Sequence, residues 1–246
     1  MGWTSAASRA PVLRLASGSP GKQDRLRGGD TDAVAGANPE ERADWPLVLQ
    51  RWQAVTFLHW SYDPAVVQRL LPPGLTVHTH CGLAWVGLAP FLLWDFRPPG
   101  VPAIPWLSSF PETNIRTYVL DSRGRDGLWF LSLDAASLVT VASAQASLWL
   151  PYHWAAMTVE RGSKLTYRSC RRWPPTAGHH IVVEPGSPMV PEALGERDHF
   201  LTGRWRAFTR IAGRLADIPV KHQPWPLWSV HISPDQGCQQ TCRSQR

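Results

Sequence analysis

The residues best suited to chemistry in this 246-residue chain lie in one stretch, residues 110–120, which reads FPETNIRTYVL. Alternate side chains of a strand project to opposite faces. A strand here therefore places an acid, an amide, a guanidinium and a phenol on one side: Glu112, Asn114, Arg116 and Tyr118. If this face points into a closed sheet, the charges predict a polar pocket. The alternative is an exposed sheet face with ordinary surface ion pairs.

The spacing within this row suggests roles for its members. Glu112 and Arg116 are about 13 Å apart along an extended strand, so they do not pair with each other. In a catalytic interpretation, Arg116 binds a substrate carboxylate as a two-pronged donor. Asn114 adds a binding contact, and Glu112 moves a proton. The plain alternative for Arg116 is a structural ion pair with an acid such as Asp121 or Asp134.

A second group of candidates follows the strand. Tyr152 and His153 come directly after Pro151, and we expect them to polarise or protonate the substrate. The nearby Trp149 suits an aromatic-lined binding site. For His153 the alternative is a hydrogen-bonded histidine of the core or the rim.

Metal and cofactor signals are weak. His78 and His80 share a strand face, but no third ligand at a metal-binding spacing accompanies them. The four cysteines form neither a disulfide framework nor two metal-binding pairs, and Cys238 and Cys242 are expected to be free thiols. We predict no metal, no cofactor and a reducing, cytoplasmic environment.

The net charge of +6 comes from the ends of the chain. Residues 1–28 carry five basic residues and one acidic residue, Arg243 and Arg246 add two positive charges, and residues 29–242 are formally neutral. This distribution argues against a nucleic-acid partner. The uncharged runs 74–94 and 135–159 contain polar residues and prolines, which is unlike a membrane span. We expect a soluble protein; the basic, serine-containing start of the chain leaves organelle targeting as the alternative.

The pattern along the chain predicts three regions. Residues 1–44 lack apolar periodicity and are expected to be disordered. Residues 45–232 are expected to form one α+β domain, mainly antiparallel β, with a closed or sandwiched sheet and a few short helices. The predicted strands include 53–62, 75–80, 83–94, 128–134, 157–160, 164–170, 180–184 and 204–210; the predicted helices are one that begins at Pro64, a buried one over 135–146 and one over 196–202. Residues 213–218 are expected to turn, and 233–246 to form a polar tail.

Several dispersed motifs resemble the YqjF-like family of uncharacterised proteins. They include LLPPGL at 70–75, LAWVGLAPF at 83–91, FPETNIRTYV at 110–119, GLWFLSLDA at 127–135, LPYHWAAM at 150–157, HFLTGRW at 199–205 and HQPWPL at 222–227. That family is related in fold to acetoacetate decarboxylase. The resemblance implies a cone-shaped, closed β barrel around a pocket.

The resemblance also shows where this chain lacks the Schiff-base lysine of the decarboxylase. The decarboxylase pocket glutamate would fall on Glu112, whereas its Schiff-base lysine and the neighbouring lysine would fall on Tyr152 and His153. An iminium requires an amine, and the lysines of this chain lie elsewhere: Lys22, Lys164 and Lys221. Lysine-dependent acetoacetate decarboxylation is therefore not expected.

A second departure lies at the C-terminus. Residues 233–246 show no strand pattern where the family continues with strands, which predicts an exposed sheet edge and leaves self-association open. The favoured function is a pocket enzyme acting on a small oxo-acid or carbonyl compound. The alternative is a small-molecule binder that uses the same cavity without chemistry.

Overall fold

The computed structural model of this chain describes residues 12–16, 48–105, 107–175, 177–220 and 222–232. Their strands are β1 Val12–Ala16, β2 Leu49–Gln53, β3 Val55–Tyr62, β4 Leu75–Val77, β5 Ala84–Arg97, β6 Phe110–Asp121, β7 Asp126–Ala135, β8 Tyr152–Arg161, β9 Leu165–Arg171, β10 Gly178–Pro188, β11 Arg206–Ile211, β12 Arg214–Pro219 and β13 Leu227–Ile232. The helices are α1 Pro64–Gln68, α2 Leu138–Leu148, the 3-10 turn Pro191–Ala193 and α3 Glu196–Thr202.

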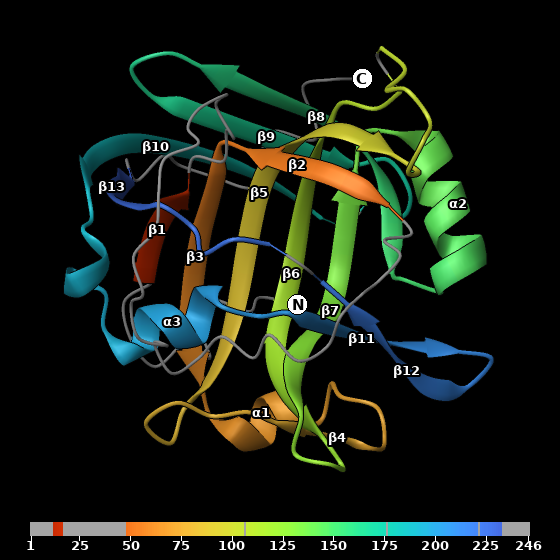
Figure 1. Cartoon of the computed structure of the whole chain (residues 1–246), viewed down its shortest axis with the longest axis vertical. Coiled ribbons are helices and arrows are strands. Elements are labelled where there is room, and N and C mark those ends of the chain that lie inside the picture. The colour runs from red at the N-terminus through yellow and green to blue at the C-terminus, as the bar shows by residue number, and fades with distance from the viewer. Residues whose placement is uncertain (1–11, 17–47, 106, 176, 221, 233–246) are drawn as a thin grey trace, which may run out of the picture.

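The strand pairings form a closed ring. Its members follow the order β7-β8-β9-β10-β13-β1-β3-β5-β6, and β6 pairs with β7 to complete the circle. Most pairs are antiparallel, with short parallel contacts between β7 and β8 and between β7 and β11. Figure 1 shows β3, β5, β6 and β7 side by side, with β2 crossing in front of β5 and β6. The predicted mainly antiparallel, closed-sheet fold is confirmed.

Two hydrogen bonds identify the inner face of this ring. The hydroxyl of Thr113 on β6 lies 2.8 Å from Nε2 of His179 on β10. That of Thr56 on β3 lies 3.0 Å from the hydroxyl of Tyr167 on β9. Each bond joins strands that are four places apart around the ring, so it crosses the interior. Because side chains alternate, the row that contains Glu112 lies on the outer face of the ring.

Most local predictions are confirmed. β6 and β7 form a hairpin, and so do β8 and β9. Asp63 caps α1, because its carboxylate accepts a hydrogen bond from the backbone N–H of Ala65 at 2.7 Å. α3 spans residues 196–202 as predicted.

Two predictions of local structure are wrong. The helix expected to be buried over 135–146 is α2, which begins after its cap Ser137 and buries only Thr140 and Val141. This helix lies on the outside of the ring and contacts it along one narrow face, so most of its residues are not buried. The turn expected over 213–218 is instead a hairpin of β11 and β12 around Gly213, whose φ of 82° suits glycine.

The chain ends also differ from expectation. Residues 12–16, expected to be disordered, form β1 between β3 and β13, where both neighbours supply backbone hydrogen bonds. β13 pairs with β10 as well as β1, so it is not the exposed edge that the C-terminal sequence predicted. The end strands of the sheet path are β12 and β4. The rest of 1–44 and the tail 233–246 lie outside the described residues.

Three further predictions concern the chain's chemistry. Cys81 is a free, exposed thiol, whereas Cys170 on β9 is disulfide-bonded, so the cysteines do not all remain thiols. His78 and His80 pack against the ring of Phe200, and no cluster of three metal-binding side chains occurs among the described residues. No helix in the described ranges is long and apolar enough to cross a membrane.

Candidate functional site

The polar row of β6 is buried on the outer face of the ring. Glu112 is 3 % exposed, Asn114 1 %, Arg116 5 % and Tyr118 0 %. An exposed sheet face with surface ion pairs is therefore excluded. The row is buried because elements outside the ring, including β2, α2 and α3, pack over this face. The pocket expected inside the closed sheet is thus replaced by a covered site on its outside.

One end of the row holds a carboxyl–phenol pair. The hydroxyl of Tyr152, at the start of β8, donates to the carboxyl group of Glu112 and lies 3.2 Å from both oxygens. Burial raises the pKa of Glu112 to about 8; the Tyr152 hydrogen bond opposes this shift and the charge of Asp134 adds to it. Burial and the neighbouring Glu112 raise the pKa of Tyr152 well above 10. At neutral pH Glu112 is therefore mostly a neutral acid that can donate a proton.

The centre of the row contains polar groups without partners. Among the described residues, neither the oxygen nor the nitrogen of the Asn114 amide has a hydrogen-bond partner, and Nε of Arg116 has none. No acidic side chain pairs with Arg116 within the described ranges, although its guanidinium lies 5.0 Å above the ring of Phe57. Buried charges and amides usually have partners. This arrangement therefore fits the binding of an anion.

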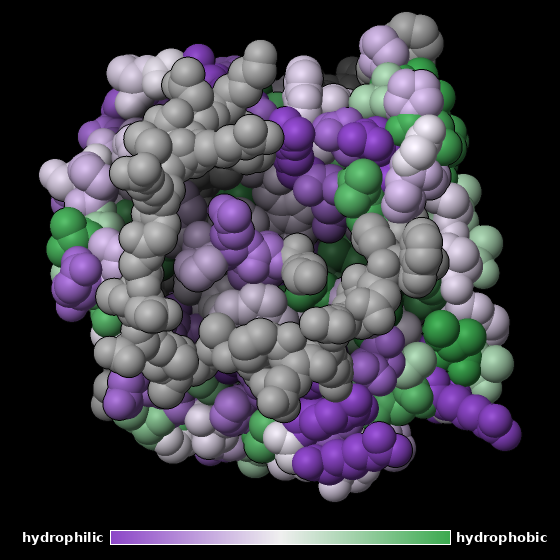
Figure 2. All heavy atoms as spheres, in the orientation of Figure 1, coloured by the Kyte–Doolittle hydropathy of each residue, from purple (hydrophilic) through white to green (hydrophobic). Residues whose placement is uncertain are grey.

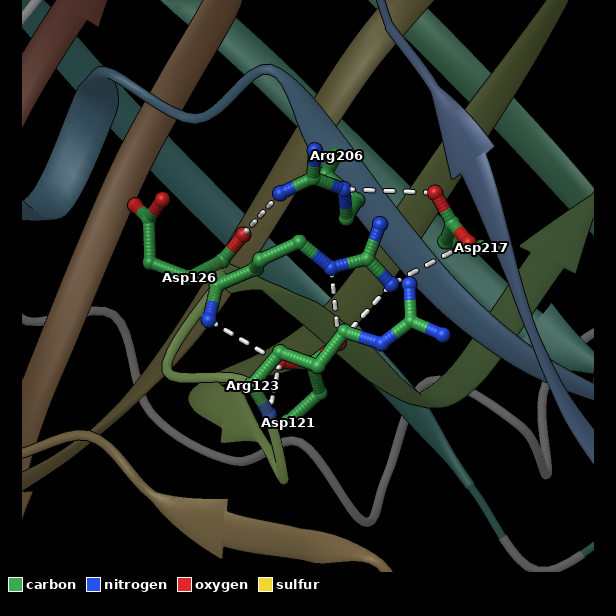
Figure 3. A network of polar contacts seen from close by, with 6 residues as sticks. Asp121, Arg123, Asp126, Arg206 and Asp217 are labelled. Carbon is green, nitrogen blue, oxygen red and sulfur yellow. Dashed lines mark hydrogen bonds and ion pairs between the residues drawn. The ribbon is translucent and has the colours of Figure 1, made fainter.

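The acids proposed as structural partners of Arg116 are engaged elsewhere. Asp121 accepts from Arg125 at 2.8 Å and from the backbone N–H of Arg123, within the network shown in Figure 3. Asp134 forms a buried ion pair with Arg171 at 2.7 Å. The structural ion pairs that the sequence offered for Arg116 are therefore not formed.

At the other end of the row, Tyr118 meets β3 and α3. Its hydroxyl lies 2.7 Å from Nε2 of His59 and donates to the carbonyl of Leu201 at 2.6 Å. A second buried guanidinium, that of Arg204, lies 5.1 Å from the Tyr118 ring. Unlike Arg116, Arg204 has an acidic partner, because its Nε is 3.4 Å from a carboxylate oxygen of Asp126.

Two predicted site residues lie elsewhere. His153 pairs in register with Asp134, which places it on the inner face of the ring with Arg171. Burial lowers the pKa of His153, the charge of Arg171 lowers it further and that of Asp134 opposes the shift. Trp149 follows α2 and is 57 % exposed. Because Tyr152 and His153 are adjacent on a strand, only Tyr152 reaches Glu112.

The surface in front of β5 and β6 is hollowed. Figure 2 shows a recess near the centre of this face, with hydrophilic residues in it. On β5, the residues beside the polar row have small side chains or none. Gly87 pairs with Arg116, and Ala89 pairs with Asn114. Two further surface pockets, of about 390 and 310 Å³, lie around Trp149 and Trp154 and include no residue of the β6 row.

Several residues of this site were not predicted as site residues from the sequence. Phe57 and His59 were predicted only as members of a strand. Trp225, whose ring lies 5.9 Å from that of Phe57, belongs to the HQPWPL motif. The alternation of residues 55–62 groups Phe57 with His59. Their position near Arg116 depends on the pairing of β3 with β5 and of β5 with β6, which no local pattern predicts.

Comparison with solved structures defines the fold class. An acetoacetate decarboxylase-like enzyme from Sphingomonas wittichii RW1 superposes with a TM-score of 0.53 over 87 % of this chain and 91 % of its own, at 14 % identity. The enduracididine biosynthesis enzyme MppR complexed with pyruvate gives 0.51 over 87 % and 88 %, at 15 % identity. Acetoacetate decarboxylase from Legionella pneumophila gives 0.50 over 85 % and 86 %, at 13 % identity. The fold is that of the acetoacetate decarboxylase-like proteins.

Sequence comparison defines the family. Residues 49–241 match the DUF2071 family of uncharacterised conserved proteins, and the chain belongs to it. The uncharacterised protein YqjF of Bacillus subtilis (strain 168) is 35 % identical over 182 residues, which are 74 % of this chain and 75 % of YqjF.

Proposed function

We propose that this protein binds a small oxo-acid over the outer face of β6 and carries out acid–base chemistry on its carbonyl group without a Schiff base. The observation that carries the proposal is Arg116, a buried guanidinium with no acidic partner in the described part of the chain. A ligand carboxylate supplies the missing counter-charge, and the free Asn114 amide supplies a further hydrogen bond. MppR, a protein of the same fold, has a solved structure complexed with pyruvate, which is such an oxo-acid.

The carbonyl group is assigned to the other end of the row. Along the strand, Glu112 lies about 13 Å from Arg116 at the Cα atoms, so a ligand that contacts both residues requires both side chains to reach toward it. A neutral Glu112 carboxyl donates a hydrogen bond to the carbonyl oxygen. In its ionised form the same group accepts a proton from the carbon next to the carbonyl and returns it. Tyr152 orients the carboxyl through its hydrogen bond.

A non-catalytic binder is the second candidate function. The observation that favours a binder is the residue at the position of the Schiff-base lysine. By the resemblance, Tyr152 occupies that position in this chain. A phenol with a pKa well above 10 is a poor nucleophile at neutral pH. The same site would then hold the oxo-acid by its carboxylate alone.

Pyruvate distinguishes the two functions. We expect saturable quenching of tryptophan fluorescence by pyruvate, and exchange of pyruvate methyl protons for deuterium in D₂O, followed by NMR. Acid–base chemistry predicts both signals, and a binder predicts quenching alone. Absence of quenching at millimolar pyruvate would contradict both functions.

Tyr152→Phe tests the orienting role of the phenol. The variant removes one hydroxyl while keeping the ring. We expect the exchange rate to fall about 10- to 100-fold, because the Glu112 carboxyl loses the one side-chain hydrogen-bond partner that it has within the described residues. Pyruvate affinity should change less than about threefold, because Arg116 is untouched. An unchanged exchange rate would remove Tyr152 from the mechanism.

Borohydride trapping tests the absence of a Schiff base. Treatment with pyruvate and borohydride is expected to leave the mass of the protein unchanged in mass spectrometry, because a reducible iminium needs an amine at the carbonyl. Lys164 is surface-exposed and paired with Glu184, away from the β6 row. A pyruvate-dependent adduct on a lysine would contradict the proposed chemistry.

A further inference from the structure

The hydroxyl group of Tyr118 is the hydrogen-bonding centre next to the proposed carboxylate site. It donates to the Leu201 carbonyl at 2.6 Å, so its own proton is used. Nε2 of His59, 2.7 Å away, must then carry a proton and donate to the Tyr118 oxygen. The positive charge of Arg116 also acts on this phenol. The Tyr118 hydroxyl therefore links His59 on β3 to Leu201 on α3, and it lies beside the guanidinium of Arg116 on the same face of β6.

We propose that Tyr118 and His59 are positioning residues for Arg116, which set its guanidinium at the place where the carboxylate binds. This inference rests on the proposed function. The Arg116 guanidinium lies over the face of Phe57 and interacts electrostatically with the Tyr118 phenol, and its Cγ and the His59 ring both lie over Gly87. A guanidinium fixed by two neighbours loses little conformational entropy when it binds an anion. Its Nε, which bonds to nothing in the described structure, stays free for the ligand.

The backbone of β5 makes this arrangement possible. His59, Gly87 and Arg116 lie in register across the adjacent strands β3, β5 and β6. A Cβ atom at Gly87 would lie 2.8 Å from two atoms of the His59 ring and 3.6 Å from Cγ of Arg116. Such a contact is too short for a real side chain. Glycine at 87 therefore allows the imidazole to lie across β5 and reach Tyr118.

The same network connects the site to the outer layer. Leu201 belongs to α3, which packs over the β6 row, and its carbonyl takes the Tyr118 proton. The phenol beside Arg116 is thus linked through its hydroxyl group to the docking of α3. The proposed proton transfer at Glu112 does not involve the buried His59–Tyr118 pair. Positioning of Arg116 gives this pair a role.

Tyr118→Phe is the test, with Tyr167→Phe as the matched control. Tyr167 is equally buried, and its hydroxyl also donates to a backbone carbonyl, that of Ala54, at 2.6 Å, but it lies inside the ring. The two variants should therefore lose similar thermal stability. We expect Tyr118→Phe to weaken pyruvate binding about tenfold and Tyr167→Phe less than twofold, by fluorescence titration. Methyl pyruvate, which has no carboxylate, should bind both variants and the wild type within about twofold of one another.

A second variant keeps the inference testable if Tyr118→Phe does not fold. Gly87→Ala should displace His59 and weaken pyruvate about tenfold, whereas Gly162→Ala, whose Cβ would meet only the Lys164 carbonyl at 3.9 Å, should not. Pyruvate affinity equal to wild type in a folded Tyr118→Phe or Gly87→Ala variant overturns the positioning role and leaves the proposed function intact. Failure of the wild type itself to bind pyruvate overturns both.

Discussion

Arg116→Met is expected to abolish pyruvate binding while making the protein more stable, by about 1–3 kcal/mol in the free energy of unfolding. The reason is that Arg116 is a buried charge with no acidic partner in the described structure. Methionine fills a similar volume without the cost of desolvating a cation. The lost contact with Tyr118 offsets only part of this gain. Chemical denaturation and pyruvate titration of the same preparation measure both effects.

Arg171→Met is the matched control for this prediction. Arg171 is mostly buried, with 11 % of its side chain exposed, but it forms an ion pair with Asp134 at 2.7 Å and a hydrogen bond to Ser132. Removing it leaves the buried Asp134 carboxylate without its cationic partner, so we expect a loss of about 3–5 kcal/mol. Pyruvate binding at the outer face should persist in whatever fraction stays folded. If Arg116→Met were destabilised to the same degree, Arg116 would be a structural ion-pair member and the anion site would be excluded.

Glu112→Gln is expected to change both the pH dependence of stability and the chemistry. The folded pKa of Glu112 is raised to about 8 from 4.5, so the folded state favours the protonated form. The stabilisation from this proton is complete below about pH 4.5 and is lost as the pH rises through about 8. Glutamine mimics the protonated acid at every pH. The variant should therefore gain stability relative to wild type between about pH 4.5 and 8, by several kcal/mol in total, and no further above that range.

Urea denaturation at a series of pH values measures this difference. Glu160→Gln is the control, because Glu160 lies at the surface, paired with Arg168, and should show little pH-dependent difference from wild type. In the exchange assay, wild-type activity should rise with pH to a plateau above about 8 as the carboxylate base forms, and Glu112→Gln should lose exchange at least about 100-fold. Parallel pH–stability curves for wild type and Glu112→Gln would show that Glu112 is ionised throughout.

The family resemblance and the strand patterns together predict much of the candidate site. The alternation in residues 110–120 groups Glu112, Asn114, Arg116 and Tyr118 on one face, and their shared burial agrees with that grouping. The resemblance assigns Tyr152 to the position of the Schiff-base lysine, and in the structure Tyr152 forms a hydrogen bond with Glu112. His153 was grouped with Tyr152 because they are neighbours in sequence, although neighbours on a strand point in opposite directions.

Which face of the sheet is inside could not be obtained from the pattern. Both faces of β6 are buried, so alternation of polar and apolar residues does not distinguish the interior of the ring from a face covered by an outer layer. The hydrogen bond from Thr113 to His179 joins residues 66 positions apart, and no local signal predicts it. The same limit applies to β1, whose ladder partners are supplied by strands distant in sequence.

The sequence by itself determined the local elements and the membership of the polar row, because both follow from the period of a strand and from short-range turn and cap chemistry. Only the tertiary structure decided that this row faces outward beneath α3, that Arg116 lacks an acidic partner in the described chain and that His59 reaches Tyr118 across Gly87. These properties depend on the order in which distant strands pair, and that order is set by packing over the whole ring rather than by any one segment.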